Sequence, residues 1–457
     1  MPMLRSFNWR LVPMQAGALV TFALLPLWDR FPHAEPPPLL LPDLNVSYFV
    51  ILLPVLWTIG AWLAAGLPGL AALRRDRRRR AWALALLGLA LWSFVSQEWA
   101  FMRADAPEVG ATAALQLGIV ALFAVAVACA GPPPRAVVAV LAVMLVGNAA
   151  VTILQAHNQG SVGLSLLGEF TFGPDKPGIG VVQADGVRWV RPLGLMPHAN
   201  MLAGTLVAGL AACAACVLSP RPVVRWLAGA AFAFGLLALL LTFSRAAWLG
   251  LAAGVFAVAP LLRPALRDRA ARRQVGGVTG LALLIGVAFL ATFAPYLAAR
   301  AGAGQESIEL RSVADRIVFT DFALRSIIER PLPGVGIGNF PWRTSYYLAQ
   351  TFYELRGDHV HHVYLLAWAE LGIVGLGLLV AALIMGIEAA LRAVRPAAVT
   401  ARLGWLDGRT ARAGLLAIVI ALVVIGLFDH YPWTILHFQL LWWGALATAA
   451  RTRGGWG

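Results

Sequence analysis

The sequence predicts an all-α polytopic membrane protein with about twelve transmembrane helices and two long loops on one side, the larger partly helical. Of the 457 residues, 60% are hydrophobic and only 13% are charged, whereas soluble domains carry about 25% charged residues. Apolar runs long enough to cross a bilayer recur along the whole chain. The net charge of +14 comes mainly from arginines clustered between those runs. This pattern is typical of membrane proteins, so we expect a lipid bilayer and no nucleic acid as partner.

Twelve segments satisfy the requirement of roughly 20 predominantly apolar residues for a membrane span. They are 11–28, 46–70, 81–101, 110–130, 136–155, 199–218, 225–243, 246–262, 275–298, 363–391, 413–429 and 432–450. The seventh and eighth are separated at Ser244-Arg245. No A-x-A-type site closes the first apolar run, so no cleavable signal peptide is expected. The chain, 1–457, is predicted to form a single integral membrane domain.

The arginine clusters fall on one side of an alternating twelve-span arrangement. They are Arg5 and Arg10; Arg74, Arg75 and Arg77 to Arg80; Arg135; Arg221 and Arg225; Arg263, Arg267, Arg269, Arg272 and Arg273; Arg392, Arg395, Arg402, Arg409 and Arg412; Arg451 and Arg453. Because positive residues accumulate in cytoplasmic loops, both chain ends are predicted to be cytoplasmic.

Two long loops, 156–198 and 299–362, lie on the opposite side. Loops of this length are usually functional or disordered. In the first, 181–184 and 187–190 flank the pair Asp185-Gly186, which predicts a β-hairpin.

In the second loop, 307–329 is predicted to be an amphipathic helix that lies on the membrane surface or caps a cavity. Its expected apolar face comprises Val313, Ile317, Leu324 and Ile327, and its polar face Arg311, Asp315, Arg325 and Glu329.

Four polar stretches gather at the outer boundary. They are 191–200 (RPLGLMPHAN); 242–245 (TFSR); Arg316 followed by 331–340 (PLPGVGIGNF); and 361–365 (HHVYL) with Glu370, Gly372 and Gly375. An arginine on this side, such as Arg245, is disfavoured by the positive-inside rule and needs a reason.

Together these stretches resemble the O-antigen ligase family, within the superfamily of O-antigen ligases and polymerases. The resemblance covers roughly 190–376. The last stretch is similar to the family pattern H-N-x-x-L…E-x-G, with His361 in the histidine place and Glu370 and Gly372 at the matching distance. His362 stands where the family has asparagine.

The resemblance implies a glycosyltransferase at the periplasmic face of a bacterial inner membrane. The donor would be O-antigen polysaccharide on undecaprenyl diphosphate, and the acceptor a sugar hydroxyl of lipid A-core. The implied catalytic residues are His361, Arg191 and Arg245. Donor binding would involve Arg191, Arg245, Arg316 and Arg311, with His198, Asn200, His362 and Glu370 in support.

The residue types suit this chemistry. A diphosphate leaving group needs its charge stabilised, and the sequence has no D-x-D cluster to hold a metal. Arginines would therefore bind the phosphates, a histidine would act as base, and neither metal nor other cofactor is expected. Since no paired carboxylates suggest a covalent intermediate, single displacement with inversion is the simpler expectation.

Other interpretations remain open at this point. Arg191 could anchor the chain at the interface beside Trp189, Arg316 could pair with Asp315 or Glu309, and Glu370 could be a structural partner of another span. The glycine-rich run 334–338 is better explained as a tight turn than as a phosphate cradle. Asp429 and His430 are secondary site candidates.

Two other functions are weighed against the ligase. An O-antigen polymerase would use the same donor with a second lipid-linked glycan as acceptor. A transporter of lipid-linked glycan would bind the diphosphate without chemistry, but transporters place their sites near the bilayer midplane. Sugar specificity and oligomeric state stay open.

Overall fold

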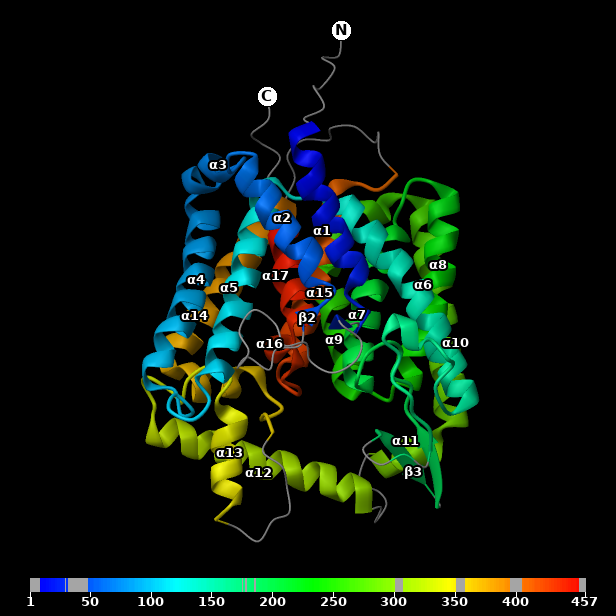
Figure 1. The fold of residues 1–457 in the computed structure, drawn as a ribbon. Coiled ribbons are helices and arrows are strands. Elements are labelled where there is room, and N and C mark those ends of the chain that lie inside the picture. Colours follow the sequence, from blue (N-terminus) through cyan, green and yellow to red (C-terminus); the bar gives the residue numbers. More distant parts are fainter. Residues whose placement is uncertain are drawn as a thin grey trace.

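The structure is a computed structural model that describes residues 9–28, 30–31, 48–174, 176, 179–184, 186–300, 307–350, 358–394 and 405–451. The side chains of 30–31, 48–49 and 307–312 are outside this description. Helices dominate, packed as an upright bundle with one long helix, α12 (Ser307–Glu329), laid across its lower end (Figure 1).

Twelve helices coincide with the twelve predicted spans. They are α1 (Val12–Leu24), α2 (Leu52–Ala64), α4 (Arg77–Val95), α5 (Pro107–Ala130), α6 (Pro134–Asn158), α7 (Ala199–Cys216), α8 (Pro222–Leu241), α9 (Arg245–Leu262), α10 (Arg269–Thr292), α14 (Val363–Val394), α15 (Gly408–Ile425) and α17 (Leu436–Ala450). In the described part of the chain, nine helices are long and apolar enough to cross a membrane. The helices α1, α2 and α17 have only 13, 13 and 15 residues. The all-α polytopic fold is confirmed, and three predicted spans are shorter than a crossing of roughly 20 residues requires.

Shorter elements connect these helices. They are η1 (Trp9–Leu11), β1 (Arg30–Phe31), β2 (Tyr48–Phe49), α3 (Leu70–Arg75), η2 (Ser96–Trp99), η3 (Ser165–Leu167), β3 (Val181–Ala184), β4 (Val187–Val190), η4 (Ala265–Arg267), α11 (Ala294–Arg300), α13 (Phe340–Leu348) and α16 (Tyr431–Thr434).

Small residues let the central helices approach closely. A Cβ on Gly254 of α9 would lie 2.3 Å from the carbonyl oxygen of Ala417 in α15, and one on Gly250 would lie 2.8 Å from that of Ala421. Small residues at the interface are the usual way for helices to pack within a membrane. The helices α7 and α15 are largely buried, whereas α10 lies at the outside of the bundle.

The beginning of α1 and the end of α17 meet at one end of the bundle, which we call the arginine-rich end. Gln15 Nε2 donates to the Ala130 carbonyl at 3.2 Å, and Arg451 donates to the adjacent Gly131 carbonyl. The first and the last of the described long helices therefore share one end of the bundle.

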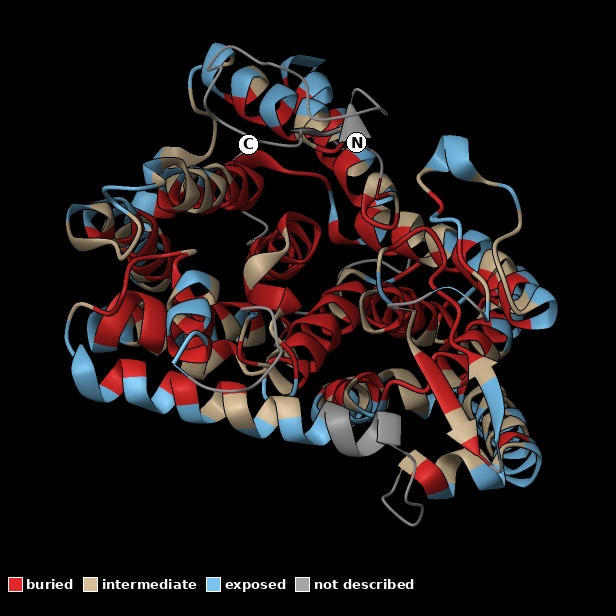
Figure 2. Ribbon diagram, turned by 60° about the horizontal axis from the view of Figure 1, so that its bottom comes forward, coloured by how far each residue is buried: buried red, intermediate tan, exposed pale blue. Residues whose placement is uncertain are grey.

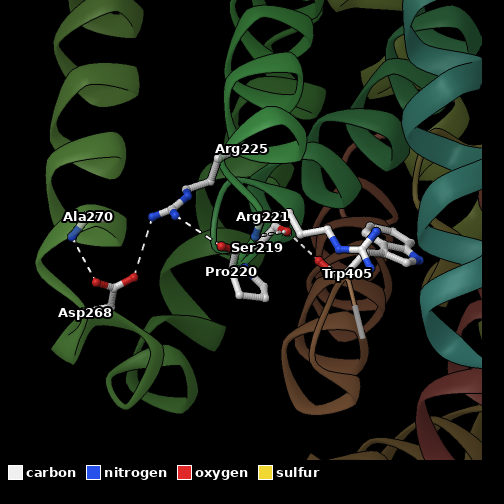
Figure 3. A network of polar contacts seen from close by, with 7 residues as sticks. All are labelled: Ser219, Pro220, Arg221, Arg225, Asp268, Ala270 and Trp405. Atoms are coloured by element: carbon white, nitrogen blue, oxygen red, sulfur yellow. Dashed lines mark hydrogen bonds and ion pairs between the residues drawn. The ribbon is translucent and has the colours of Figure 1, made fainter. Parts of the chain in front are cut away.

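A polar network at the same end joins α8 to α10 and to the segment before α15 (Figure 3). Arg225 of α8 lies 3.6 Å from the Asp268 carboxylate, which caps α10 by accepting the Ala270 amide at 3.0 Å. Ser219 accepts the Arg221 amide at 3.1 Å and donates to the Trp405 carbonyl. Some of the basic residues in the predicted cytoplasmic loops therefore tie helices together.

The opposite end, which we call the loop end, carries the two long loops. The predicted hairpin is confirmed: β3 and β4 pair antiparallel with Val181 opposite Val190 and Ala184 opposite Val187. The strand β3 is mostly buried and β4 mostly exposed (Figure 2). Gly186, at φ +75°, occupies the turn, whereas Asp185 is outside the described residues.

The helix predicted over 307–329 is confirmed as α12, but its predicted apolar face is not the face that packs on the rest of the protein. Of that face only Ile327 is buried, and Val313, Ile317 and Leu324 are exposed. The residues buried along α12 are Phe319, Phe322, Ala323, Ser326 and Ile327. The aromatic stripe faces the protein because α12 packs on α13 and α14, and periodicity alone could not choose between two apolar stripes. Buried and exposed residues alternate along this helix in Figure 2.

The break between α8 and α9 also follows the prediction. Phe243 adopts φ +53°, a left-handed conformation that a helix interior does not accommodate. Its ring is fully buried against Phe289 and Phe293 of the α10 region. Aromatic packing therefore stabilises a strained turn and exposes the Thr242 carbonyl to other segments.

Candidate active site

Arg191 lies directly after the hairpin and is buried, with 5% of its surface exposed. Its backbone amide donates to the Gly180 carbonyl at 3.0 Å, continuing the pairing of the hairpin strands. Its Nε donates to the Thr242 carbonyl at 2.6 Å, and Nη2 donates to Asn200 Oδ1, also at 2.6 Å. A buried guanidinium held by two fixed acceptors has a set direction, so Arg191 is more than an interfacial anchor.

Asn200, in the first turn of α7, connects Arg191 to the C-terminal part of the chain. Its Nδ2 donates to Asp429 Oδ2 at 2.8 Å, a contact between residues 229 positions apart. The amide thus accepts from a cation on one side and donates to a carboxylate on the other. Arg191, Asn200 and Asp429 form one continuous polar chain.

Two buried polar residues fix the segment that carries Arg191. Gln155 of α6 accepts the amides of Leu193 and Gly194 at 3.1 and 2.6 Å and donates to Glu169 Oε1 at 2.7 Å. Glu169 in turn accepts the Val162 amide at 2.7 Å. Sequence analysis did not single out either residue, although a glutamine within an apolar span is itself a sign of a polar contact.

Asp429 and His430 belong to the short connection between α15 and α16. Burial opposes ionisation of Asp429, but the imidazoles of His430, His361 and His198 and the bond from Asn200 hold its pKa below the usual value. His430 places Nδ1 2.9 Å from Thr434 Oγ1. Burial lowers the pKa of His430 to about 4, against the opposing charge of Asp429. An ionised aspartate thus lies beside a neutral imidazole.

His361 faces this pair from the loop before α14. Its ring meets that of His430 edge to face, with centroids 5.3 Å apart. Donor atoms of His361, Asp429 and His430 lie within 4.8 Å of one another. The His361 Nδ1 atom is buried and has no hydrogen-bond partner among the described residues. The predicted base therefore keeps a nitrogen available next to a carboxylate that could stabilise its protonated form.

The two neighbouring histidines have different surroundings. His362 Nδ1 accepts the Leu365 amide at 3.2 Å and so caps α14. His359 lies over His430, with ring centroids 4.8 Å apart, and burial together with that imidazole lowers its pKa to about 3. This geometry favours His361 over His362 as the base, in line with the motif.

His198 caps α7 in the way that His362 caps α14, because its Nδ1 accepts the Asn200 amide at 3.1 Å. Surrounding protein, then the Arg191 charge, and further the charges of His361 and Arg316 lower its pKa to about 4, with Asp429 opposing them. Its ring nevertheless keeps solvent-exposed surface. The four residues whose charges act on His198 come from four separate segments, so several elements converge here.

The remaining predicted arginines lie at different distances from this centre. Arg245 begins α9, three residues after Thr242; its side chain is exposed, and Nη1 donates to the Arg300 carbonyl at 2.7 Å. Arg316 is half-buried, three residues before Phe319 on the buried stripe of α12. It makes no ion pair with Asp315 in the described part of the chain, and Glu309 and Arg311 are outside the described side chains.

Glu370 is a structural partner of other segments, one of the two roles considered for it. Its carboxylate accepts the Gly338 amide at 3.0 Å and Trp433 Nε1 at 3.0 Å. The Glu370 carbonyl accepts the Gly336 amide at 2.8 Å. Glu370 thus joins the glycine-rich turn to α16, the helix that follows His430.

The glycines of both motifs allow this contact. Gly372 has φ +67°, and a Cβ there would lie 1.8 Å from the Leu332 carbonyl oxygen. A Cβ on Gly334 would lie 2.3 Å from the Glu370 carbonyl oxygen. The run 334–338 is therefore a tight turn, as predicted. It packs against the kink of α14 and contacts Glu370.

The whole constellation lies at the loop end. Figure 1 places α16, the short helix that follows His430, between α12 and the arginine-rich end. A buried guanidinium, a carboxylate and an imidazole meet where loop and membrane helices join. This combination suits transfer of a group from a phosphorylated donor to a hydroxyl.

Residues 230–380 match the family model described as O-antigen ligase. This region of the chain is therefore similar to the O-antigen ligase family. The predicted resemblance to the superfamily of O-antigen ligases and polymerases is confirmed by this match. No curated protein compared with the chain gave a match.

The matched region includes Arg245, Arg316, His361 and Glu370 but neither Arg191 nor Asp429. The family supports ligase- or polymerase-type glycosyl transfer with lipid-linked glycans by a multi-pass membrane protein. The contact between Asn200 and Asp429 thus links segments on both sides of the matched region.

Proposed function

We propose that the chain is an O-antigen ligase that transfers O-antigen polysaccharide from undecaprenyl diphosphate to a lipid A-core sugar. The reaction would take place at the periplasmic face of a bacterial inner membrane. The observation that carries the proposal is the polar chain from Arg191 through Asn200 to Asp429, with His361 beside its end. These contacts support a site in which an arginine for the diphosphate and a base lie close together, with the base inside the region that is similar to O-antigen ligase.

Donor binding is assigned to arginines from separate segments. The bond to the Thr242 carbonyl fixes the direction of the Arg191 guanidinium. Arg245 follows Thr242 by three residues, and its side chain is exposed. Arg316 lies on the side of α12 that carries the buried residues, and its charge lowers the pKa of His198. Planar guanidinium groups match phosphate oxygens in two-point contacts. They would neutralise the charge that develops on the diphosphate as it leaves.

The chemical step is a single displacement. The acceptor hydroxyl oxygen forms a bond with the anomeric carbon as the bond from that carbon to the diphosphate oxygen breaks. The bonding electron pair leaves with undecaprenyl diphosphate, and the hydroxyl proton passes to an imidazole nitrogen of His361. Asp429 stabilises the resulting imidazolium. One displacement inverts the anomeric configuration.

The proposal is tested with purified protein in lipid nanodiscs, lipid-linked O-antigen and lipid A-core, without nucleotide and with EDTA. The expected result is a joined product with inverted anomeric configuration, absent in His361→Ala and retained in His157→Gln, which replaces an exposed histidine of α6. A parallel reaction replaces lipid A-core with a second lipid-linked glycan. Product only in that reaction would identify a polymerase, and no product in either would refute glycosyl transfer.

A further inference from the structure

Three side chains in the site have the composition of a metal centre. His361, Asp429 and His430 offer two imidazole nitrogens and one carboxylate oxygen within 4.8 Å of one another. Two histidines and a carboxylate are a common protein ligand set for zinc, with a fourth position left to water or substrate. This cluster differs from an acidic surface patch, because Asp429 is buried and His361 has a buried nitrogen without a hydrogen-bond partner in the described structure.

We infer that His361, Asp429 and His430 form an inhibitory site for a divalent transition-metal ion of the zinc type. The inhibitory part rests on the proposed role of His361 as base. A metal bound to the imidazole uses the lone pair that would accept the acceptor's proton. The ion would therefore stop transfer while leaving the arginines free to bind donor.

The neighbouring contacts prepare the ligands for this role. Thr434 engages His430 Nδ1 at 2.9 Å, which leaves Nε2 of that ring for a metal. Asn200 holds one oxygen of Asp429 at 2.8 Å, and the His430 amide holds the other at 2.9 Å. Each oxygen retains a second lone pair. Such outer contacts orient metal ligands and raise affinity.

The geometry needs only a modest adjustment. In a tetrahedral zinc site with bonds of about 2.0–2.1 Å, ligand atoms are roughly 3.3 Å apart. The three donor atoms must therefore close from separations of up to 4.8 Å. The positive charge of Arg191 is separated from the carboxylate by the neutral amide of Asn200, so a cation at the cluster does not contact the guanidinium directly.

The test uses full-length protein without a polyhistidine tag. Co²⁺ serves as the spectroscopic probe, because its visible absorption reports coordination, and Zn²⁺ competition gives the affinity. The variants are His430→Asn and Asp429→Asn, with His157→Gln as a control that removes a histidine outside the cluster. Thr434→Val keeps all three ligands and removes the hydroxyl that contacts His430 Nδ1 at 2.9 Å and the His430 carbonyl at 3.4 Å.

We expect His430→Asn and Asp429→Asn to weaken Zn²⁺ binding by at least about tenfold, and Thr434→Val to weaken it by about tenfold. The His157→Gln control should bind as the wild type does. Zn²⁺ should inhibit wild-type transfer, EDTA should restore it, and Mg²⁺ at the same concentration should not inhibit. Because Thr434→Val retains the ligand set, it tests the site even if a ligand variant fails to fold.

Binding and transfer are measured separately, so the two proposals can fail separately. A Co²⁺ spectrum that is absent, or unchanged in all three cluster variants, overturns the metal site whatever the activity shows. A site that binds Zn²⁺ without reducing transfer overturns the inhibitory role, and with it the assignment of His361 as base. Loss of transfer in wild-type protein on EDTA treatment, with recovery on adding Zn²⁺, overturns inhibition in favour of a required metal.

Discussion

The Asn200 side-chain amide connects the two charged parts of the site, Arg191 and Asp429. Replacing it by alanine removes the acceptor of Arg191 Nη2 and the donor to Asp429 Oδ2, at 2.6 and 2.8 Å. Both charged partners are buried, each with 5% of its surface exposed. Water therefore replaces the lost bonds poorly. We expect Asn200→Ala to fold and to lose most of its transfer activity.

The size of the effect follows from the two bonds. A hydrogen bond to a charged group contributes about 1.5–3 kcal/mol, so the pair contributes roughly 3–6 kcal/mol. If half of this is expressed in the transition state for transfer, the barrier rises by about 1.5–3 kcal/mol. Since about 1.4 kcal/mol corresponds to a factor of ten in rate, kcat/KM should fall about 10- to 160-fold.

The assay is initial-rate transfer in nanodiscs at saturating and at limiting donor. Asn148→Ala is the control, because Asn148 is a buried asparagine that donates within α6 to the Met144 carbonyl. It should change transfer by less than about threefold. Thermal unfolding of both variants separates loss of fold from loss of function.

A double-mutant cycle tests whether the hydrogen-bonded residues Asn200 and Asp429 act together in transfer. If Asn200 works through Asp429, the double variant Asn200→Ala, Asp429→Ala should lose at least about 1 kcal/mol less than the sum of the single losses. Additive losses, or near wild-type transfer in Asn200→Ala, would refute the proposed coupling between donor arginine and base.

Four further outcomes are expected. His361→Asn should abolish transfer, whereas His362→Asn should retain it because asparagine also caps α14; the reverse result would move the base by one position. Arg191→Lys and Arg245→Ala should each lower transfer by at least about tenfold, unlike Arg188→Ala on the exposed hairpin strand, and equal rates in all three would remove both arginines from the donor site. Gly372→Ala should prevent folding, since its Cβ meets the Leu332 carbonyl, whereas Gly377→Ala has open space; expression and gel filtration compare them. Stability should be complete above about pH 6.5 and decline towards pH 4, because the folded protein keeps His430 neutral with a pKa of about 4 while the unfolded chain binds a proton; the loss is up to about 3 kcal/mol, and the unfolding midpoint of His430→Asn should depend less on pH.

Local signals made much of the fold predictable. Apolar runs placed the helices, a D-G pair between two short β-rich runs placed the hairpin, and the polar Ser244-Arg245 step placed the break between α8 and α9. These features depend on residues within about one turn or one span of each other. The histidine and arginine stretches could likewise be found because the O-antigen ligase pattern preserves their order and spacing.

The differences between prediction and structure concern which face of a helix packs on the protein and where helices begin and end. The predicted apolar stripe of α12 is not the one that packs on the protein, because two stripes satisfy the helical period and only packing on α13 and α14 selects one. Three predicted spans became helices of 13 to 15 residues, since the hydrophobicity of a run does not fix where its helix begins and ends.

The sequence by itself determined which segments cross or approach the membrane and which polar residues lie at the loop end. Only the tertiary structure decided that Asn200 joins Arg191 to Asp429, that Glu370 links the glycine-rich turn to α16, and that His361 faces Asp429 and His430. The physical reason is the range of the interactions. Hydrophobicity and turn preferences act over a few residues, whereas these side chains meet only after helices from distant parts of the chain have packed, and burial then makes each contact strong.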